Sequence, residues 1–236
     1  MVDLKAEMAQ LWASLGGAWS PPSPGHGRMI QFIGGRRGEG TSTVAREFAR
    51  YAVERVRRAV WLVDLDLLNN AQHAALAADP ARFGVLGRPA AASPDGSAFF
   101  TVQPAVRGQD GRTWPDAGYL VAHPVGHTRL WATRFRRESM RPDQTVHILG
   151  SGAYWGALRR YADLIVVDAP SLDRSPAGLA VAPFADVNVM VMSADTGDVR
   201  ASSQLKEALT AAGARCGGIF FNRVTVEPPK FLKARS

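Results

Sequence analysis

Residues 34–43 read GGRRGEGTST and give the strongest indication of how this 236-residue chain folds. The apolar run MIQFI precedes this stretch at residues 29–33, and an amphipathic run follows it at 44–58. Strand, glycine-rich loop and helix, in this order, form the context of a phosphate-binding loop. Glycines let the backbone curl so that several N–H groups point at one anion, and the helix N-terminus adds the positive end of its dipole.

The loop matches the pattern GxxxxGK[ST] from Gly35 through Gly40 to Ser42, with one exception. Thr41 stands at the position of the lysine that normally reaches the β- and γ-phosphates. No neighbouring lysine replaces it, and a tight turn between strand and helix would explain the glycines alone equally well. The predicted nucleotide-binding residues of this altered loop are Gly38, Glu39, Gly40, Thr41, Ser42 and Thr43.

The length of 236 residues suffices for one sizeable α/β domain or two small ones, and with 46% apolar residues the chain can bury a core. The net charge of +7 predicts an acidic partner, such as nucleic acid, anionic lipid or an acidic protein surface, without choosing among them. Cys216 is the only cysteine, which excludes an intramolecular disulfide. The sequence shows neither an apolar run near 18 residues nor a signal-peptide pattern, so we expect a cytoplasmic protein.

Hydrophobic periodicity predicts how the chain is divided. We expect an N-terminal helix over residues 1–16, a linker over 17–27, a single α/β domain over 28–225 and a basic tail over 226–236. Within the domain, residues 88–117 are rich in Gly, Pro, Ala and Asp, which predicts an irregular insertion.

Apolar runs and amphipathic runs alternate along the domain. Strands are expected at residues 59–63, 118–122, 146–149, 164–167, 187–192 and 217–222. Helices are expected at residues 71–78, 130–138, 153–162 and 200–212. The alternation predicts an α/β fold, a mostly parallel sheet with helices on both faces.

Three aspartates follow predicted strands at the point where each strand ends. Asp64 and Asp66 follow the run at 59–63, and Asp168 follows the run at 164–167. The carboxyl ends of parallel strands meet at one edge of a sheet, where ligands bind. Since Mg²⁺ prefers oxygen ligands, we predict that Ser42, Asp64 and Asp168 hold this ion, directly or through water.

Four segments together resemble one protein family. They are RGEGTST at residues 37–43, LVDLDL at 62–67, YADLIVVDAP at 161–170 and GIFFN at 218–222. They are similar to the PGEGKST, LVDADLR, YDxxIxDxPP and GVVLN segments of the bacterial tyrosine kinase (BY-kinase) family of capsule and exopolysaccharide synthesis. That family belongs to the wider MinD/ParA-like class of P-loop NTPases. The resemblance covers residues 28–70 and 146–224 and is weak between them.

The resemblance implies ATP or ADP with Mg²⁺ as cofactors, Asn222 as an adenine contact, and Asp64 or Asp66 as the general base. Arg36 stands where MinD/ParA-like proteins carry a signature lysine, and we hypothesise that Arg36 or Arg37 replaces part of the missing charge. The implied partner is a membrane polysaccharide co-polymerase or its cytoplasmic tail, at the inner face of the membrane. A homo-oligomer is left open, and nucleic acid is not favoured.

The departures from the family pattern concern catalysis. Thr41 replaces the catalytic lysine, and the C-terminal tyrosine cluster is absent because the last tyrosine is Tyr161. We therefore predict a kinase-like regulator of polysaccharide synthesis or export, a pseudokinase that is catalytically weak or inactive. Two alternatives stay open, namely an active ATP-dependent protein-tyrosine kinase or ATPase of the same pathway, and a ParA/MinD-like positioning ATPase.

Overall fold

The computed structural model describes residues 4–18, 25–107, 111, 113–195 and 197–224. Its strands are β1 (Arg28–Gly34), β2 (Ala59–Asp64), β3 (Ala90–Ala91), β4 (Phe100–Gln103), β5 (Leu120–Pro124), β6 (Leu130–Phe135), β7 (Thr145–Ile148), β8 (Ala162–Asp168), β9 (Val187–Ser193) and β10 (Cys216–Asn222). Its α-helices are α1 (Lys5–Ala18), α2 (Thr41–Ala52), α3 (Ala71–Ala78), α4 (Pro80–Phe83), α5 (Ala153–Arg159), α6 (Ala177–Val181) and α7 (Val199–Ala211). Short 3-10 helices are η1 (Asp116–Tyr119), η2 (Arg137–Ser139) and η3 (Ala182–Phe184).

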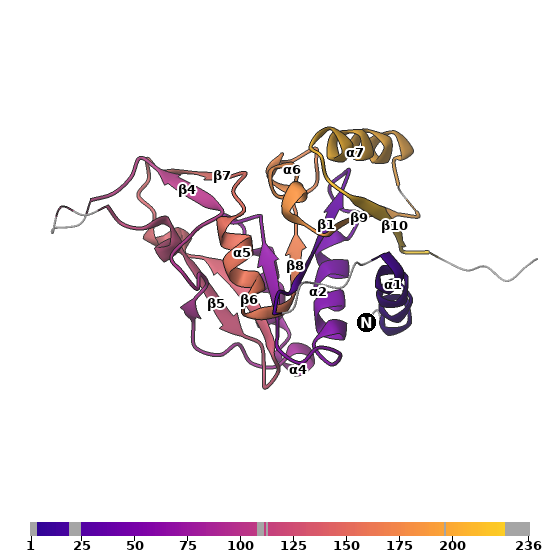
Figure 1. Cartoon of the computed structure of the whole chain (residues 1–236), viewed down its shortest axis with the longest axis horizontal. Helices are drawn as coiled ribbons and strands as arrows, with labels where there is room; N and C mark the ends of the chain where they lie inside the picture. Colours follow the sequence, from indigo (N-terminus) through magenta and orange to yellow (C-terminus); the bar gives the residue numbers. More distant parts are fainter. Residues whose placement is uncertain (1–3, 19–24, 108–110, 112, 196, 225–236) are drawn as a thin grey trace, which may run out of the picture.

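One eight-stranded sheet runs through the molecule in the order β10-β9-β1-β8-β2-β6-β5-β3 (Figure 1). The strands from β10 to β6 are parallel, whereas β5 and β3 continue the sheet in antiparallel pairing. The central strand β1 has β8 on one side and β9 on the other. The predicted α/β fold with a mostly parallel sheet is therefore confirmed.

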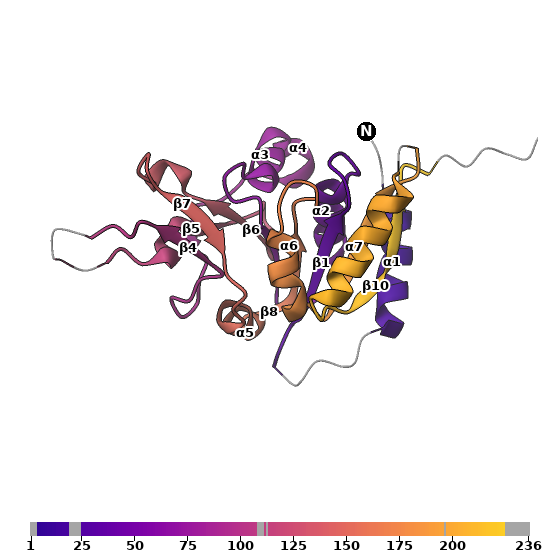
Figure 2. The ribbon, with the colours of Figure 1, turned by 90° about the horizontal axis from the view of Figure 1, so that it is seen from above.

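The side chains of β1 alternate between two hydrophobic cores. Met29 and Ile33 belong to the core that also contains residues of α5, α6 and α7. Ile30 and Phe32 belong to the core that contains residues of α1, α2 and α3. Figure 2 shows these two sets of helices on opposite faces of the sheet. A strand that is buried on both faces is typically apolar, and residues 29–33 are apolar except for the buried Gln31, whose Nε2 donates to the carbonyl of Gly178 and to Oδ1 of Asn188.

The N-terminal helix packs on the second of these cores, as its periodicity predicts. Met8 and Leu15 of α1 are buried, and the ring of Trp12 lies 5.9 Å from that of Phe48 on α2. The helix extends to Ala18, two residues beyond its predicted end. Residues 19–24 of the predicted linker and the predicted tail at 226–236 lie outside the described residues.

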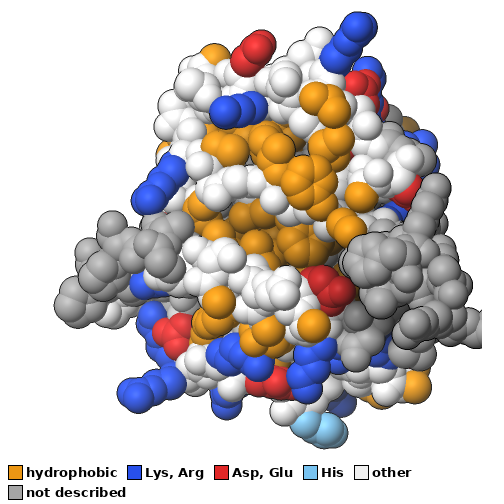
Figure 3. Space-filling view, turned by 90° about the vertical axis from the view of Figure 1, so that its right-hand side faces the viewer, with side chains coloured by type: hydrophobic (Ala, Val, Ile, Leu, Met, Phe, Trp, Pro, Cys, Tyr) orange, Lys and Arg blue, Asp and Glu red, His pale blue; other side chains and the backbone are white. Residues whose placement is uncertain are grey.

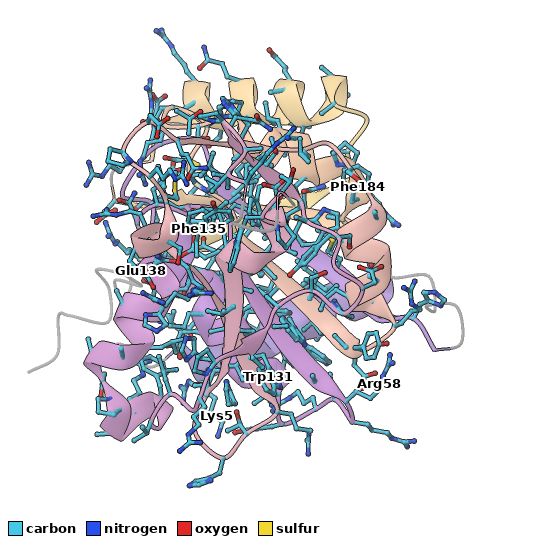
Figure 4. The ribbon with its side chains drawn as sticks, turned by 90° about the vertical axis from the view of Figure 1, so that its left-hand side faces the viewer. Lys5, Arg58, Trp131, Phe135, Glu138 and Phe184 are labelled. Carbon is cyan, nitrogen blue, oxygen red and sulfur yellow. The ribbon has the colours of Figure 1, made fainter. Side chains whose placement is uncertain are left out.

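The predicted helix over residues 130–138 is wrong, because this segment forms β6 followed by η2. β6 pairs in parallel with β2, with Trp131 opposite Trp61. Figure 4 shows Trp131 and Phe135 along the strand and Glu138 beyond it. Leu130, Ala132 and Phe135 are buried while the intervening Trp131 and Arg134 are less so. Pairing with β2 overrides the local spacing of apolar residues that predicted a helix.

The insertion at residues 88–117 contains two short strands, β3 and β4. β4 pairs with β7 in a separate two-stranded sheet that projects from one end of the molecule (Figure 1). The strand predicted at 146–149 is thus present, but outside the main sheet. Phe99 anchors the insertion, since its ring stacks 4.9 Å from that of Trp155 on α5.

The opposite end of the sheet is formed by the edge strand β10. Ile219 and Phe221 of this strand are exposed, and a groove of about 1010 Å³ lies between β10 and α1. Figure 3 shows the apolar surface on this side of the molecule. Within the described ranges, no helix has the length and apolar character that a membrane span requires.

Candidate nucleotide-binding site

The loop between β1 and α2 has the geometry that its glycines predict. Gly38 and Gly40 adopt φ angles of 92° and 86°, in the left-handed region that glycine enters without strain. Among the described residues, no side chain caps the N-terminus of α2 by a hydrogen bond. The N–H of Thr43 donates to the carbonyl of Gly40 (3.0 Å), which leaves the N–H groups of Thr41 and Ser42 and the helix dipole available to an anion.

Glu39 holds the loop in shape. Its Oε2 accepts a 3.0 Å hydrogen bond from the N–H of Arg36, and its backbone carbonyl accepts one of 3.0 Å from Nδ2 of Asn222. Burial of the side chain raises the pKa of Glu39, and the bond from the Arg36 N–H opposes that rise. Asn222, which the family resemblance assigns to adenine, is thus bonded to the glycine loop from the end of β10.

Two carboxylates meet at the edge of the sheet. Asp64 and Asp168 end the neighbouring strands β2 and β8 and stand opposite each other in register, both buried. The carboxylate of Asp64 accepts hydrogen bonds from the N–H groups of Asp66 (2.9 Å) and Gln72 (3.0 Å). Burial raises the pKa of Asp64, and the charge of Asp168 raises it further. Burial also raises the pKa of Asp168, against hydrogen bonds from Gln72 and Ser42 that lower it.

Gln72, in the first turn of α3, joins these groups and was not among the predicted site residues. It is fully buried, and its Nε2 donates to Oδ2 of Asp168 (2.6 Å) and to the carbonyl of Ser42 (2.8 Å). Its Oε1 accepts a 3.1 Å hydrogen bond from Nη1 of Arg46. The available signal was its place at the start of a predicted helix, just after the strand that ends in Asp64.

A cavity of about 290 Å³ lies over the glycine loop. Residues 36–43 line it together with Asp66 and Asp168, whereas Asp64 is absent from its lining and lies behind these groups. Arg174, another residue that the sequence did not suggest, also lines the cavity. It belongs to the loop after β8, and its position past Asp168 was the signal that could have found it.

The structure therefore places the predicted residues at one edge of the sheet but in two hollows. Asn222 lines the groove between β10 and α1, not the cavity over the loop. The two hollows share Gly40, Thr43 and Arg223 in their walls, so they meet beside the N-terminus of α2. A bound nucleotide can lie across this junction, with phosphates over the loop and the base toward Asn222.

The oxygen groups fit a magnesium ion that is bound together with phosphates. Oδ1 of Asp168 is buried and has no hydrogen-bond partner among the described residues. The described part of the chain contains no group of three or more His, Cys, Asp or Glu side chains that could hold a metal by themselves. Mg²⁺ usually binds one or two carboxylates, phosphate oxygens and water, which is compatible with Asp168 and Ser42. These residues would hold the ion, which would neutralise phosphate charge there.

Comparison with known proteins identifies solved structures that share this fold. No protein-family model and no curated protein matches the chain. The kinase domain of the Escherichia coli tyrosine kinase ETK aligns with 95% of this chain and 79% of its own, at 13% identity and a TM-score of 0.57. The chimerical protein CapA2B2 aligns over 94% and 85%, at 17% identity and a TM-score of 0.57. The chain has the fold of bacterial tyrosine kinase domains.

A protein solved in complex with ATP has a similar fold. A McdA variant from Cyanothece, in complex with ATP, aligns over 82% of this chain and 68% of its own, at 16% identity and a TM-score of 0.52. The predicted resemblance to the kinases is confirmed at the level of architecture. At such identities, activity has to be argued from the residues of the site.

Proposed function

We propose that the chain is a nucleotide-binding, kinase-like regulator of exopolysaccharide or capsule-type polysaccharide synthesis or export, with weak or absent phosphoryl transfer of its own. Thr41 carries this proposal. This residue stands at the lysine position and is buried. Its hydroxyl packs closely on Gly34, because a Cβ atom at Gly34 would lie 2.8 Å from Oγ1 of Thr41. A neutral side chain in this place provides no charge to the β- and γ-phosphates, and losing one such donor typically costs about 10²-fold in rate.

The other site residues support retained nucleotide binding. Ser42 and Asp168 would hold Mg²⁺, and the loop residues Gly38 to Thr43 would hold the phosphates. Of the two aspartates considered for the general base, Asp66 lines the cavity while Asp64 does not. Asp66 is therefore the better candidate to accept a proton, and Asp64 orients its neighbours through the hydrogen bond from the Asp66 N–H.

The proposed partner is a membrane polysaccharide co-polymerase, contacted through its cytoplasmic tail. The net charge of +7 supports a location at the inner face of the membrane, because anionic lipid attracts basic proteins. In the host, we expect gene deletion to change polymer length or export. Complementation with wild type and with Thr41→Lys then distinguishes a regulator, which needs no lysine, from an impaired enzyme.

Calorimetric titration with Mg-ATP and Mg-ADP tests the nucleotide site directly. We expect binding by the wild type and its loss in Asp168→Ala, with phosphoryl transfer detectable only after Thr41→Lys. Binding that is equal in the two proteins would remove Asp168 from the metal site. No binding at millimolar nucleotide would refute nucleotide-dependent regulation.

A second candidate is an active kinase or ATPase of the same pathway. Asp66 favours it, because a carboxylate that lines the phosphate cavity is the group such chemistry requires. Wild-type transfer of the γ-phosphate to a protein tyrosine, abolished by Asp66→Asn, would establish this candidate over the first. Salt-dependent binding to plain DNA would instead favour a positioning ATPase.

A further inference from the structure

Because Thr41 replaces the usual lysine, a different cation would have to bind the terminal phosphates. Among the described residues, no lysine lines the phosphate cavity, but arginines do. They are Arg36, Arg37, Arg174 and Arg223. Arginine binds phosphate oxygens in two-pronged geometry, so any of them has suitable chemistry. Arg37 is exposed, and the ion pairs of the other three side chains distinguish them from one another.

Arg36 and Arg223 are directed to aspartates of the segment between β9 and α7. Nη2 of Arg36 lies 3.3 Å from Oδ2 of Asp198, a residue that also caps α7 through the N–H groups of Arg200 and Ala201. Nη1 of Arg223 lies 3.8 Å from Oδ2 of Asp195. Both arginine side chains are about half exposed (52% and 50%), so they stand at the rim.

Arg174 differs because its partner belongs to the metal edge of the site. Its Nη2 lies 3.0 Å from Oδ2 of Asp66, and the N–H of Asp66 donates to Oδ1 of Asp64. The guanidinium thus reaches from the loop after β8 to the end of β2. This position puts a positive charge beside the carboxylates, over the same cavity that Thr41 and Ser42 line.

The segment that carries Arg174 is fastened to the glycine loop at two points. The N–H of Leu172 donates to the carbonyl of Gly34 (3.0 Å), and Oδ2 of Asp173 accepts from the N–H of Arg37 (3.3 Å). A turn hydrogen bond from the Arg174 N–H to the Ser171 carbonyl (2.9 Å) fixes the backbone of Arg174 itself. The backbone of Arg174 is therefore held beside the loop, and the ion pair with Asp66 directs its guanidinium, which together reduce the entropy lost when it binds a ligand.

We propose that Arg174 is the phosphate-binding cation of this protein and takes the role that the lysine has in the usual loop. The inference rests on the proposed nucleotide-binding function and names the residue that supplies its missing charge. In this structure Arg174 is neutralised by Asp66. Phosphate oxygens of a bound nucleotide would replace Asp66 as the partner of Arg174, and Asp66 would keep the hydrogen bonds that it accepts from Nδ2 of Asn69 (2.8 and 2.9 Å).

Calorimetric titration with Mg-ATP tests this assignment on four proteins, the wild type, Arg174→Ala, Arg36→Ala and the double variant Arg174→Ala/Thr41→Lys. Loss of Arg174 should weaken ATP binding by about 10- to 100-fold, the range for a hydrogen bond to a charged group. Arg36→Ala removes the other candidate cation and should weaken binding less than Arg174→Ala does, because Arg36 is paired with the partly exposed Asp198 away from the carboxylates that end β2 and β8; a larger loss in Arg36→Ala would assign the role to Arg36 instead. The lysine of the double variant should restore affinity to within about fivefold of wild type.

The possible results distinguish the role of Arg174 from the proposed nucleotide-binding function. Wild-type binding that survives Arg174→Ala would overturn the role of Arg174 and leave the proposed function intact. Loss that Thr41→Lys does not repair would also overturn it, since it would indicate a structural role. A wild type that binds no ATP would refute the nucleotide function and this inference together. If Arg174→Ala does not fold, Arg174→Gln replaces it throughout, because it keeps a hydrogen-bond donor for Asp66 while removing the charge.

Discussion

Nε2 of Gln72 donates a 2.6 Å hydrogen bond to Oδ2 of Asp168, and so ties the first turn of α3 to the end of β8. The same nitrogen donates to the carbonyl of Ser42 at the start of α2, and the backbone N–H of Gln72 donates to Asp64. The side chain of Gln72 therefore joins the glycine loop's helix to Asp168, and its backbone N–H adds the link to Asp64. Both donors are neutral and can serve these carboxyl groups whether or not they are ionised.

Gln72→Leu tests this connecting role. The substitution keeps the approximate volume but leaves a carboxylate and a carbonyl with one hydrogen bond fewer, so we expect the free energy of unfolding to fall by about 1–3 kcal/mol. Mg-ATP affinity should fall as well, because Asp168 and Ser42 lose their common support. Urea denaturation and calorimetric titration measure the two effects.

Gln144→Leu is the matched control. Gln144 is also buried and donates to a backbone carbonyl, that of Pro104, but does not line the phosphate cavity. It should lower stability while leaving ATP affinity unchanged. Equal losses of affinity in the two variants would show that Gln72 acts only through general stability.

Asp168→Asn should change how stability depends on pH. Burial raises the pKa of both Asp168 and Asp64 above their ordinary value of 3.8, so the folded state binds more protons than the unfolded state at pH values above 3.8. Wild-type stability must then fall as pH rises from about 4 through the raised pKa values. The neutral amide removes one of the charges and the repulsion on Asp64, so the variant should be more stable than wild type at pH 8.

Urea denaturation between pH 4.5 and 8.5 measures this difference, which should shrink toward the acidic end. Excess Mg-ATP is the control, because it should stabilise the wild type at pH 8 and have little effect on Asp168→Asn. A variant that is less stable than wild type at pH 8 would contradict the prediction. That result would mean that the hydrogen bonds of Asp168 outweigh its burial.

Arg58→Ala should destabilise the end of the sheet that lies opposite the site. Nε of Arg58 lies 2.6 Å from Oδ1 of Asp163, and its Nη atoms donate to the carbonyls of Arg160 (2.6 Å) and Ala162 (2.8 Å). Figure 4 shows Arg58 near the edge of the fold where β2 and β8 begin. Because the side chain is partly exposed, we expect a loss of about 1–3 kcal/mol, measured by urea denaturation.

Arg57→Ala provides the comparison at the neighbouring position. The Arg57 side chain is exposed, and its backbone N–H, which donates to Asp163, is kept in the variant. Its stability should stay within about 0.5 kcal/mol of wild type. Similar losses at both positions would mean that net charge, rather than the contacts of Arg58, governs this end.

The parallel sheet and the glycine loop were predictable because their signals are local. A strand buried on both faces is mostly apolar, and residues 29–33 and 187–192 are apolar except for Gln31 and Asn188, which hydrogen-bond to each other. The helix predicted over residues 130–138 was wrong because a half-buried strand with arginines can show nearly the same spacing of apolar and charged residues as an amphipathic helix. What decided the outcome was pairing with β2, which is remote in sequence.

The site was predictable in part for the same reason. Asp64 and Asp168 follow apolar runs, and the parallel order of strands brings them together. Gln72 and Arg174 were missed because their roles arise from contacts across 96 and 108 residues, with Asp168 and Asp66 respectively. Neither residue type is specific for nucleotide sites, so only the folded arrangement distinguishes them from ordinary surface residues.

Gly40→Ala should damage the junction between the phosphate cavity and the groove at β10. A Cβ at Gly40 would overlap Nδ2 of Asn222, so this amide must move and its hydrogen bond to the Glu39 carbonyl must break. The residue also has a φ of 86°, which costs about 1–2 kcal/mol for a non-glycine residue. We expect lower stability and weaker ATP binding, measured by urea denaturation and calorimetry.

Gly38→Ala separates backbone strain from this collision. Gly38 has a similar φ of 92°, but a Cβ there would meet nothing within 4 Å. It should therefore show the loss due to strain alone, and Gly40→Ala should exceed it in both stability and affinity. Equal effects at the two glycines would mean that the contact with Asn222 contributes nothing measurable, and that the loop is held by Glu39 and the start of α2 alone.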